Sequence, residues 1–500
     1  MKFPSRFKSE SLLAIAALLL LVGGFTLGPA RAATPQAQSA DEKYVLERLQ
    51  HPTLADVDNL VFFLVSPEDR VAAREPPQLR LSSTFIADLV TGRYPRLKTH
   101  DINIQNAVIS GELDLSGRKI TNDVTLLNCR FEDAVSFSHS HFANYFFIGG
   151  CEFKAPVNFT GATLAGGLGI SWSTFQVSTT FVQVQVDESI EIKNSTFLGM
   201  STSFDSVQIR KEFTIRNSRF RSLQVSFDDL RVDGRFSVDG CAFSFEQNSP
   251  DEIVIMSNER PDSKVSFSGA RFGDLFLKDS SFNNISSIDF TRLQTDMLSF
   301  ERVHSTTPSD IQVQLMTFKL LRPVNADQLL QFPLSVYNPE LYAEVETFLR
   351  THGYPDEADK IFIAKKRAER RKKCNDFWGQ CNNVGAWALS MFEDLLAGYG
   401  KSLQNLLWWS LGFLLLGTWV FRSEKGMRTK EAKDAEHYEG RYNPFWYSLD
   451  LFLPIIKLGE ADVWTPKDYR RWANLYRKVH IIIGSLFVPI GLAAWTGIIK

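Results

Sequence analysis

We consider the carboxylates first, because a carbohydrate-cleaving enzyme built on a repeat scaffold needs acidic side chains gathered on one face. The candidates are Asp187, Glu188, Asp228 and Asp229. They do not recur at one position of the chain's 22-residue repeat, which favours solvated corners over a catalytic face. The sequence also has no HExxH motif, phosphate-binding loop, catalytic triad or metal-ligand cluster. We therefore expect no enzyme activity, no catalytic residue, no cofactor and no metal.

Two of the five cysteines are placed for a disulfide. Cys374 and Cys381 enclose the short loop CNDFWGQC, and export to an oxidising compartment would let a bond close this loop. Their spacing, with no histidine nearby, argues against zinc. Cys129, Cys151 and Cys241 occupy equivalent positions of the repeat, so we expect buried thiols there.

An ion filter is the other chemistry to test. The triplet Gly398-Tyr399-Gly400 has the letters of a potassium filter, but it precedes the first apolar span and lacks a preceding Thr-Val. Segment 443–466 is a better candidate, because it is apolar yet too short to cross a bilayer. We interpret it as a re-entrant segment with the candidate residues Trp446, Asp450, Lys457, Gly459, Glu460 and Asp462. The positive charge of Lys457 argues against a cation pore.

Three apolar stretches predict export and membrane insertion. The first precedes the small-residue site Ala30-Arg31-Ala32, so residues 1–32 are interpreted as a signal peptide, with a retained signal anchor as the alternative. Two further stretches, 403–421 and 480–499, are each close to the roughly 20 residues that cross a bilayer. Twelve Lys or Arg residues lie between them, which predicts a cytoplasmic loop over 422–478.

The overall charge, 55 basic against 57 acidic residues, favours no particular partner. The basic run 365–373 is a solvated helix face or, alternatively, a site for lipid head groups. We expect membrane lipids as partners, an unidentified protein or ligand on the repeat domain, and no nucleic acid. Formation of a homo-oligomer is left open.

Phenylalanine, with 40 residues, is the abundant side chain, and its spacing defines a repeat. One register is spaced by 22 or 23 residues, and each member follows a Cys or Ser by two positions: Phe131, Phe153, Phe175, Phe197, Phe220 and Phe243. A second register begins at Phe137, a third at Phe142, and a fourth is assigned to Phe147, Ile170, Ile192, Ile215 and Val238. Four short apolar segments per period predict a square coil, each side a short strand with one central residue pointing inward.

The repeat resembles the pentapeptide-repeat family, which implies a right-handed quadrilateral parallel β-helix. GATL at 161–164 and GARF at 269–272 match the family's unit, while alternate sides of six residues depart from it. A larger parallel β-helix of the polysaccharide-lyase kind is the alternative fold, and a carbohydrate-active enzyme the third functional hypothesis. The last hundred residues resemble the ion-channel-like membrane module found on bacterial pentapeptide-repeat proteins.

The predicted organisation has six parts: a signal peptide over 1–32, a linker and helical N-cap over 33–103, a β-helix over 104–300, an irregular C-cap over 301–340, a helical hairpin and juxtamembrane segment over 341–402, and a two-span module over 403–500. We expect the protein at the bacterial inner membrane, with the β-helix exported as a scaffold or binding surface. An ion-channel-like membrane protein with the β-helix as its external domain is the alternative.

Overall fold

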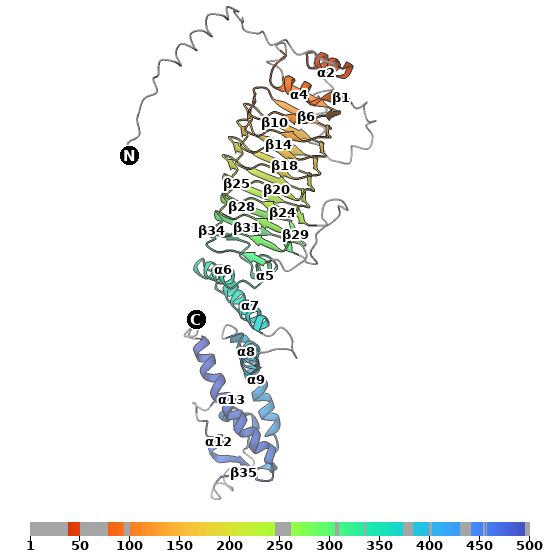
Figure 1. Cartoon of the computed structure of the whole chain (residues 1–500). Helices are drawn as coiled ribbons and strands as arrows, with labels where there is room; N and C mark the ends of the chain where they lie inside the picture. Colours follow the sequence, from red (N-terminus) through yellow and green to blue (C-terminus); the bar gives the residue numbers. More distant parts are fainter. Residues whose placement is uncertain are drawn as a thin grey trace, which may run out of the picture.

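The computed structural model describes residues 39–50, 79–94, 101–245, 262–305, 310–334, 337–373, 384–399, 403–430, 442–453, 456 and 458–495. The expected signal peptide, the cysteines at 374 and 381, and Lys457 lie outside the described residues. A column of parallel strands has helices at both ends and is followed by a helical C-terminal module (Figure 1).

The column is a parallel β-solenoid of about nine coils with a period of about 23 residues, so the predicted β-solenoid is confirmed. Most coils contain four short strands. The first sheet contains β1 (Leu79–Ser82), β3 (Ala107–Ser110), β7 (Arg130–Phe131), β11 (Glu152–Phe153), β15 (Thr174–Phe175), β19 (Thr196–Phe197), β23 (Arg219–Phe220), β26 (Ala242–Ser244), β29 (Ser281–Asn283) and β32 (His304–Ser305). The second contains β4 (Leu113–Asp114), β8 (Val135–Ser136), β12 (Val157–Asn158), β16 (Thr179–Thr180), β20 (Ser201–Ser203), β24 (Gln224–Ser226), β27 (Lys264–Ser266), β30 (Ser287–Asp289) and β33 (Asp310–Gln312).

The third sheet supplies the other two sides of the coil. One row contains β2 (Ile102–Gln105), β6 (Val124–Leu127), β10 (Phe146–Gly149), β14 (Leu168–Ser171), β18 (Ile190–Lys193) and β22 (Phe213–Arg216). The other contains β5 (Lys119–Ile120), β9 (His141–Phe142), β13 (Thr163–Leu164), β17 (Gln185–Val186) and β21 (Gln208–Ile209). Both rows pair with β25 (Arg231–Asp239) and continue as β28 (Arg271–Lys278), β31 (Gln294–Glu301) and β34 (Thr317–Arg322). The corner between these two sides therefore straightens in the later coils.

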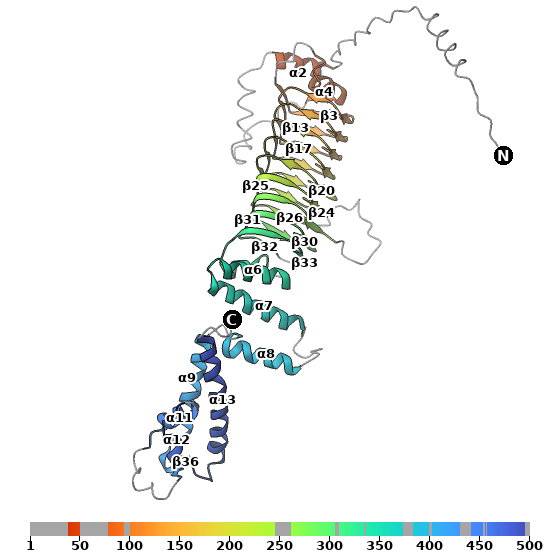
Figure 2. The ribbon, with the colours of Figure 1, turned by 90° about the vertical axis from the view of Figure 1, so that its left-hand side faces the viewer.

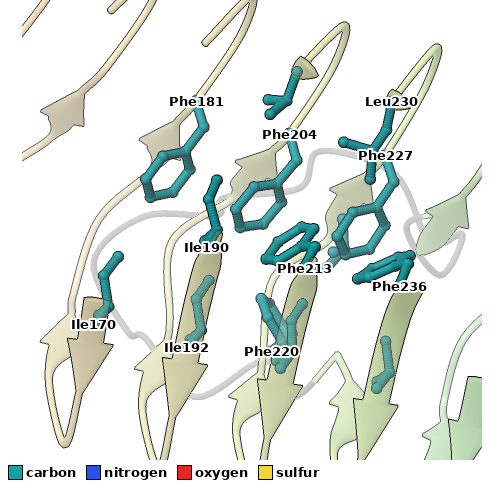
Figure 3. Close-up of a cluster of buried hydrophobic side chains, with 14 of the residues drawn as sticks. Ile170, Phe181, Ile190, Ile192, Phe204, Phe213, Phe220, Phe227, Leu230 and Phe236 are labelled. Atoms are coloured by element: carbon teal, nitrogen blue, oxygen red, sulfur yellow. The ribbon is translucent and has the colours of Figure 1, made fainter. Parts of the chain in front are cut away.

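Equivalent side chains stack on one another through the core. The six rings from Phe131 to Phe243 pair in register, with neighbouring centroids 4.7 to 5.0 Å apart and ring planes within 7° of parallel. A second column runs from Phe137 through Phe181, Phe204 and Phe227, part of which Figure 3 shows. This spacing equals the distance between hydrogen-bonded strands, so each coil supplies one ring to each column.

The small residues beside the rings form a hydrogen-bonded column. The backbone N–H of Cys151 donates to the Ser173 hydroxyl (3.1 Å), and that of Ser173 donates to Ser195 (3.2 Å). Ser195 continues the pattern onto Ser218 (3.2 Å). Each Ser hydroxyl also donates to the carbonyl oxygen two residues earlier. A small hydroxyl residue therefore satisfies backbone groups that the turn leaves unpaired.

The fourth register differs from the sequence assignment at one coil. Ile148, not Phe147, aligns with Ile170 in the core, while Phe147 pairs with Gly169 and is half-buried on the outer face. Alternating side-chain direction means that an error of one residue moves a side chain to the other face. The run Phe146-Phe147-Ile148 is apolar at every position, so hydrophobicity alone does not show whether Phe147 or Ile148 points into the core.

Helices close the N-terminal end of the solenoid. Helix α4 (Ser83–Val90) begins at the N-cap Ser82, whose side chain accepts from the N–H of Phe85, and its apolar side lies in the solenoid core. Helix α2 (Ala40–Gln50) covers the outer edge of β1: Asp41 accepts from the N–H of Arg80 (2.9 Å), and Glu42 accepts from that of Ser82 (3.3 Å). Carboxylates thus bind N–H groups that an open sheet edge would expose.

At the other end the solenoid extends beyond the expected boundary at 300. The segment from 301, expected to be irregular, contains the final strands β32, β33 and β34. Ser305 occupies the position of the Phe ladder there, so the aromatic signal is lost although the strands continue. Helices α5 (Ala326–Gln331) and α6 (Pro339–Thr351) follow and cover the last coil, and α7 (Pro355–Lys373) packs on these two helices.

The C-terminal module contains helices α8 (Val384–Ala397), α9 (Leu403–Val420), α11 (Pro444–Phe452), α12 (Glu460–Val463) and α13 (Arg471–Trp495), the 3-10 turn η3 (Glu424–Gly426), and the antiparallel pair β35 (Met427–Thr429) and β36 (Trp464–Pro466). Among the described residues, one helix is long and apolar enough to cross a membrane, over Arg471–Ala493 in α13. Two spans were expected. Gln404 and Asn405 in the first turn of α9 lower the hydropathy of the other helix.

We predict that Phe175→Asp unfolds the solenoid, because an unpaired carboxylate between Phe153 and Phe197 costs several kcal/mol, comparable with the stability of a whole domain. Circular dichroism melting and protease resistance measure the effect. Leu198→Asp is the matched control, since Leu198 is 40% exposed, and its melting should stay close to wild type. Equal melting of the two variants would show that the Phe column does not carry the stability.

Candidate functional site

The solenoid surface does not gather the candidate carboxylates into one site. Each has its own local role: Asp187 pairs with Arg210 and Glu188 with Lys211, Asp228 accepts from Ser268 N–H, and Asp229 occupies a corner with φ 53°. Across the part of the chain that the structure describes, no group of three or more His, Cys, Asp or Glu residues could hold a metal. These carboxylates therefore occupy corners of the coils or form ion pairs and hydrogen bonds between neighbouring coils.

The solenoid cysteines are buried free thiols. Burial raises the pKa of Cys241 to about 12 and raises that of Cys151 as well. A thiol with so high a pKa holds little thiolate at neutral pH and is a poor nucleophile. These cysteines therefore fill space in the column of small residues.

The Gly-Tyr-Gly triplet ends a helix. Gly398 and Tyr399 adopt left-handed backbone conformations directly after α8, with φ of 51° and 55°. The Tyr399 hydroxyl lies 2.9 Å from that of Ser390 and accepts from Arg370 (3.0 Å). The Tyr399 side chain therefore bonds to residues of α7 and α8. In a potassium filter, by contrast, backbone carbonyls line a pore.

In the C-terminal module, α11 packs between α9 and α13. At one end, the Tyr447 ring lies edge-on to Phe421, 5.0 Å between centroids. At the other end, Phe452 is buried in a cluster with Leu406 and Phe487. The nine residues of α11 therefore run beside about half of the eighteen-residue helix α9, and α11 ends among side chains of α9 and α13.

The three helices approach closely around two glycines. A Cβ atom added at Gly484 would lie 2.0 Å from the Phe452 carbonyl oxygen, and one at Gly417 would lie 2.2 Å from the Ser448 hydroxyl. Gly484 thus lets two helix backbones touch, and Gly417 leaves room for the Ser448 and His480 side chains, as small residues do between packed helices in membranes.

A buried polar group joins the helices at the same level. His480 is fully buried, and its Nε2 lies 3.1 Å from the carbonyl oxygen and 3.2 Å from the hydroxyl of Ser448. The hydroxyl donates to the Leu414 carbonyl on α9 (3.1 Å). A carbonyl oxygen only accepts, so Nε2 carries the proton, and Nδ1 is left as a buried acceptor without a partner among the described residues.

Asp450 fixes the chain that returns from α11. It is buried, and its two carboxylate oxygens accept from the N–H groups of Leu458 (2.8 Å) and Ala461 (2.6 Å). Gly459 lies between these residues with φ 92°, a conformation that other residues rarely adopt. The candidate residues Asp450 and Gly459 thus shape one loop.

The remaining candidates are more peripheral. Trp446 is 48% exposed, Asp462 is exposed and Glu460 is half-buried at the start of α12. Asp450 therefore contacts backbone groups of Leu458 and Ala461, whereas the other acidic side chains do not converge on a filter-like ring. The Phe ladder residues are all in the solenoid core.

Basic residues surround the end of the bundle where α9 ends and α13 begins. Arg470 donates to the Val420 carbonyl (3.0 Å), capping the last turn of α9. Arg428 makes two hydrogen bonds to Asp468, beside the β35–β36 pair. Positive side chains at a helix C-terminus interact favourably with its dipole.

The outward surfaces of α9 and α13 are apolar. Among their exposed side chains, Leu415 is 56% and Ile482 is 59% exposed, and others of the same kind are Leu407, Trp408, Leu411, Trp419, Leu475, Leu486 and Leu492. Polar groups such as Ser448 and His480 instead face inward. This arrangement reverses that of a water-soluble bundle, which exposes polar residues and buries apolar ones.

An ion-pair cluster joins the solenoid cap to the C-terminal module. Asp394 of α8 accepts from Arg367 (2.8 Å) and Arg370 (2.9 Å) of α7, and its side chain is only 11% exposed. Burial would raise the pKa of Asp394, but hydrogen bonds from the two arginines outweigh this and lower the pKa. Trp409 of α9 donates to the Leu395 carbonyl of α8 (3.0 Å). The link from solenoid to module therefore consists of specific contacts.

Sequence reasoning missed three of these features. His480 was interpreted only as the first residue of a span, Ser448 was not considered, and the basic run was not paired with Asp394. A histidine and a serine within apolar helices are a recognisable signal of buried polar contacts. The Asp394 pairing connects residues more than twenty positions apart, which spacing alone does not reveal.

No protein-family model, no curated protein and no solved structure matches the chain. The architecture itself defines the class: a parallel β-solenoid joined through a helical cap to a helical module with an apolar exterior.

We predict that Gly484→Ala destabilises the module by about 1–3 kcal/mol, because the added methyl group collides with the Phe452 carbonyl. Gly412→Ala is the matched control: a Cβ there meets nothing within 4 Å, so helix propensity should leave the stability equal or slightly higher. Denaturation of the detergent-solubilised full chain, followed by helical circular dichroism, compares the two. A neutral Gly484→Ala variant would contradict the close α11–α13 packing.

We predict that the Arg370–Asp394 coupling energy, measured with alanine variants in a double-mutant cycle, is about 1–3 kcal/mol near neutral pH. Because the folded pKa of Asp394 lies below its usual 3.8, this stabilisation is complete above the unfolded pKa and is lost as the pH falls through the folded pKa. The coupling should therefore stay constant from about pH 7 to about pH 5 and decline only in more acidic solution. A coupling that is absent at neutral pH, or unchanged in strong acid, would contradict the pairing.

Proposed function

We propose that the chain is a non-enzymatic scaffold or binding protein of the bacterial inner membrane, in which the C-terminal module is the anchor and the β-solenoid projects on the exported side. The observation that carries this proposal is the apolar exterior of α9 and α13 around the inward-facing Ser448 and His480. An exposed apolar surface is unfavourable in water but carries no such free-energy penalty in a lipid bilayer.

The two-span arrangement is part of the proposal. Helix α13 has the length and composition of a span, and α9 runs alongside it with exposed Trp408 and Trp419 near its two ends. Tryptophan favours the membrane–water interfaces, so these residues fit a helix that crosses the bilayer. The twelve basic residues over 422–478 favour a cytoplasmic position for the connecting segment.

For the solenoid, we propose membership of the pentapeptide-repeat type. The coil period, four short strands per coil and inward Phe or aliphatic residues support this assignment. The long strands β25, β28 and β31 depart from a regular square. A rigid column with polar corners can present side chains at repeated spacings of about 4.8 Å, which suits a binding surface for a partner protein or ligand.

The second candidate function is ion conduction. Its support is α11, which enters the bundle and stops inside it, the layout expected of a two-span channel subunit. The closest polar contacts of α11, between Ser448 and His480, are used in helix packing rather than directed to an open path. Single-channel recording of the purified chain in planar bilayers decides between the two functions, because steady unitary currents would favour conduction over a passive anchor.

We predict a specific topology from reporter fusions. Alkaline phosphatase is active only where its disulfides form, so a fusion after Lys500 should be active and a fusion at Ala435 should be inactive. The reason is the basic segment 422–478 together with the expected export signal. The reverse activity pattern would place the solenoid in the cytoplasm and would contradict the exported scaffold.

A further inference from the structure

We propose that α7 and α8 form a binding site for the head groups of anionic phospholipids at the membrane surface on the solenoid side. This inference rests on the proposed membrane placement of α9 and α13. It adds a lipid specificity that anchoring alone does not require, since a helix spans zwitterionic and anionic bilayers alike.

Helix α8 has the position of an interfacial helix. It lies crosswise to α9 and α13, at the end of the bundle where α9 begins (Figure 2). On the side that faces α7, Arg370 donates to the Ser390 carbonyl oxygen (3.1 Å) and to the Asp394 carboxylate (2.9 Å), one turn apart. Met391 and Leu395 are 47% and 55% exposed on a neighbouring side, and Trp409 of α9 contacts the Leu395 carbonyl. An amphipathic helix in this orientation lies in the head-group plane.

Helix α7 places cations directly above α8. Arg367 and Arg370 occupy the side of α7 that faces α8, and Arg367 remains 50% exposed despite its bonds to Asp394. At 100° per residue, Lys366 and Arg371 lie on either side of these two arginines. Lys366 is 42% exposed; its ammonium group approaches Glu369 at 3.8 Å and lies 5.8 Å from the centre of the Phe362 ring. Arg371 is exposed with no ion-pair partner in the described part of the chain.

The charge and the geometry together favour phospholipid over other anions. The four cations outnumber the carboxylates Asp394, Glu369 and Glu393, so the α7–α8 surface keeps a net positive charge. Packed helix axes lie about 8–10 Å apart, so side chains of α7 reach the head groups when α8 lies among them. This distance is also within a Debye length of about 8–10 Å, over which the attraction of an anionic surface persists.

The test uses the full chain reconstituted in phosphatidylcholine bilayers with a trace of photoactivatable phosphatidylglycerol, or of the matching phosphatidylcholine probe. After illumination, cyanogen bromide cleaves at Met316, Met391 and Met427. Fragment 317–391 reports α7 and the first part of α8, and fragment 428–500 provides an internal reference. The variant Lys366→Gln/Arg371→Gln keeps the Asp394 cluster, and Arg118→Gln/Lys119→Gln removes the same charge from exposed residues of the first coil.

We expect the phosphatidylglycerol probe, but not the phosphatidylcholine probe, to label fragment 317–391 preferentially. Each cation at an anionic surface is worth about 1 kcal/mol, or roughly fivefold, so the double variant should lower this labelling by about 5- to 25-fold relative to fragment 428–500. The Arg118/Lys119 variant should label like wild type. Equal labelling by the two probes, or no loss in the Lys366/Arg371 variant, would overturn the lipid site while the anchor stands. A wild-type chain that does not insert into bilayers would overturn the membrane placement and this inference with it.

Discussion

The structure depends on one constraint, the stacking of equivalent residues from successive coils at the spacing of hydrogen-bonded strands. A Phe every 22 or 23 residues places rings 4.7 to 5.0 Å apart, and each stacked pair adds about 0.5–1.5 kcal/mol to the burial of the rings. The same period aligns Ser173 with Ser195, whose hydroxyls bind backbone N–H groups one coil away. It also places left-handed residues in columns at two corners, and at one of them Asn106, Asn128 and Asn194 tolerate the conformation.

The regular column would aggregate through its open ends if they were not covered. The N-terminal edge is blocked by carboxylates of α2, and the C-terminal end by α5, α6 and α7. The C-terminal cap is also connected to the helical module by specific contacts. Asp394 of α8 pairs with α7, and Trp409 of α9 bonds to α8. In the proposed membrane-anchored scaffold, this continuous link would let the helical module set the orientation of the solenoid.

The sequence was sufficient to predict the solenoid because its period is carried by large, unmistakable residues. It was insufficient where a choice depended on one position, as with Phe147 and Ile148, or where the marker residue changed, as with Ser305 in the last coil. Segment 443–466 was singled out by its apolar length, but the roles of Asp450 and His480 depend on contacts with Ala461 and Ser448 that the chain makes only after folding. Long-range pairing is set by the helix packing, which no local pattern encodes.

The most direct test of the account is to measure which surface of the C-terminal module contacts lipid. Spin labels at Leu415→Cys and Ile482→Cys, in a reconstituted chain with Cys374 and Cys381 replaced by Ser, report collisions with apolar oxygen and with a water-soluble nickel chelate. Leu198→Cys on the solenoid, also exposed, is the aqueous reference. The account predicts that oxygen dominates at 415 and 482 and that nickel dominates at 198. Nickel dominating at all three positions would contradict the membrane-anchored solenoid.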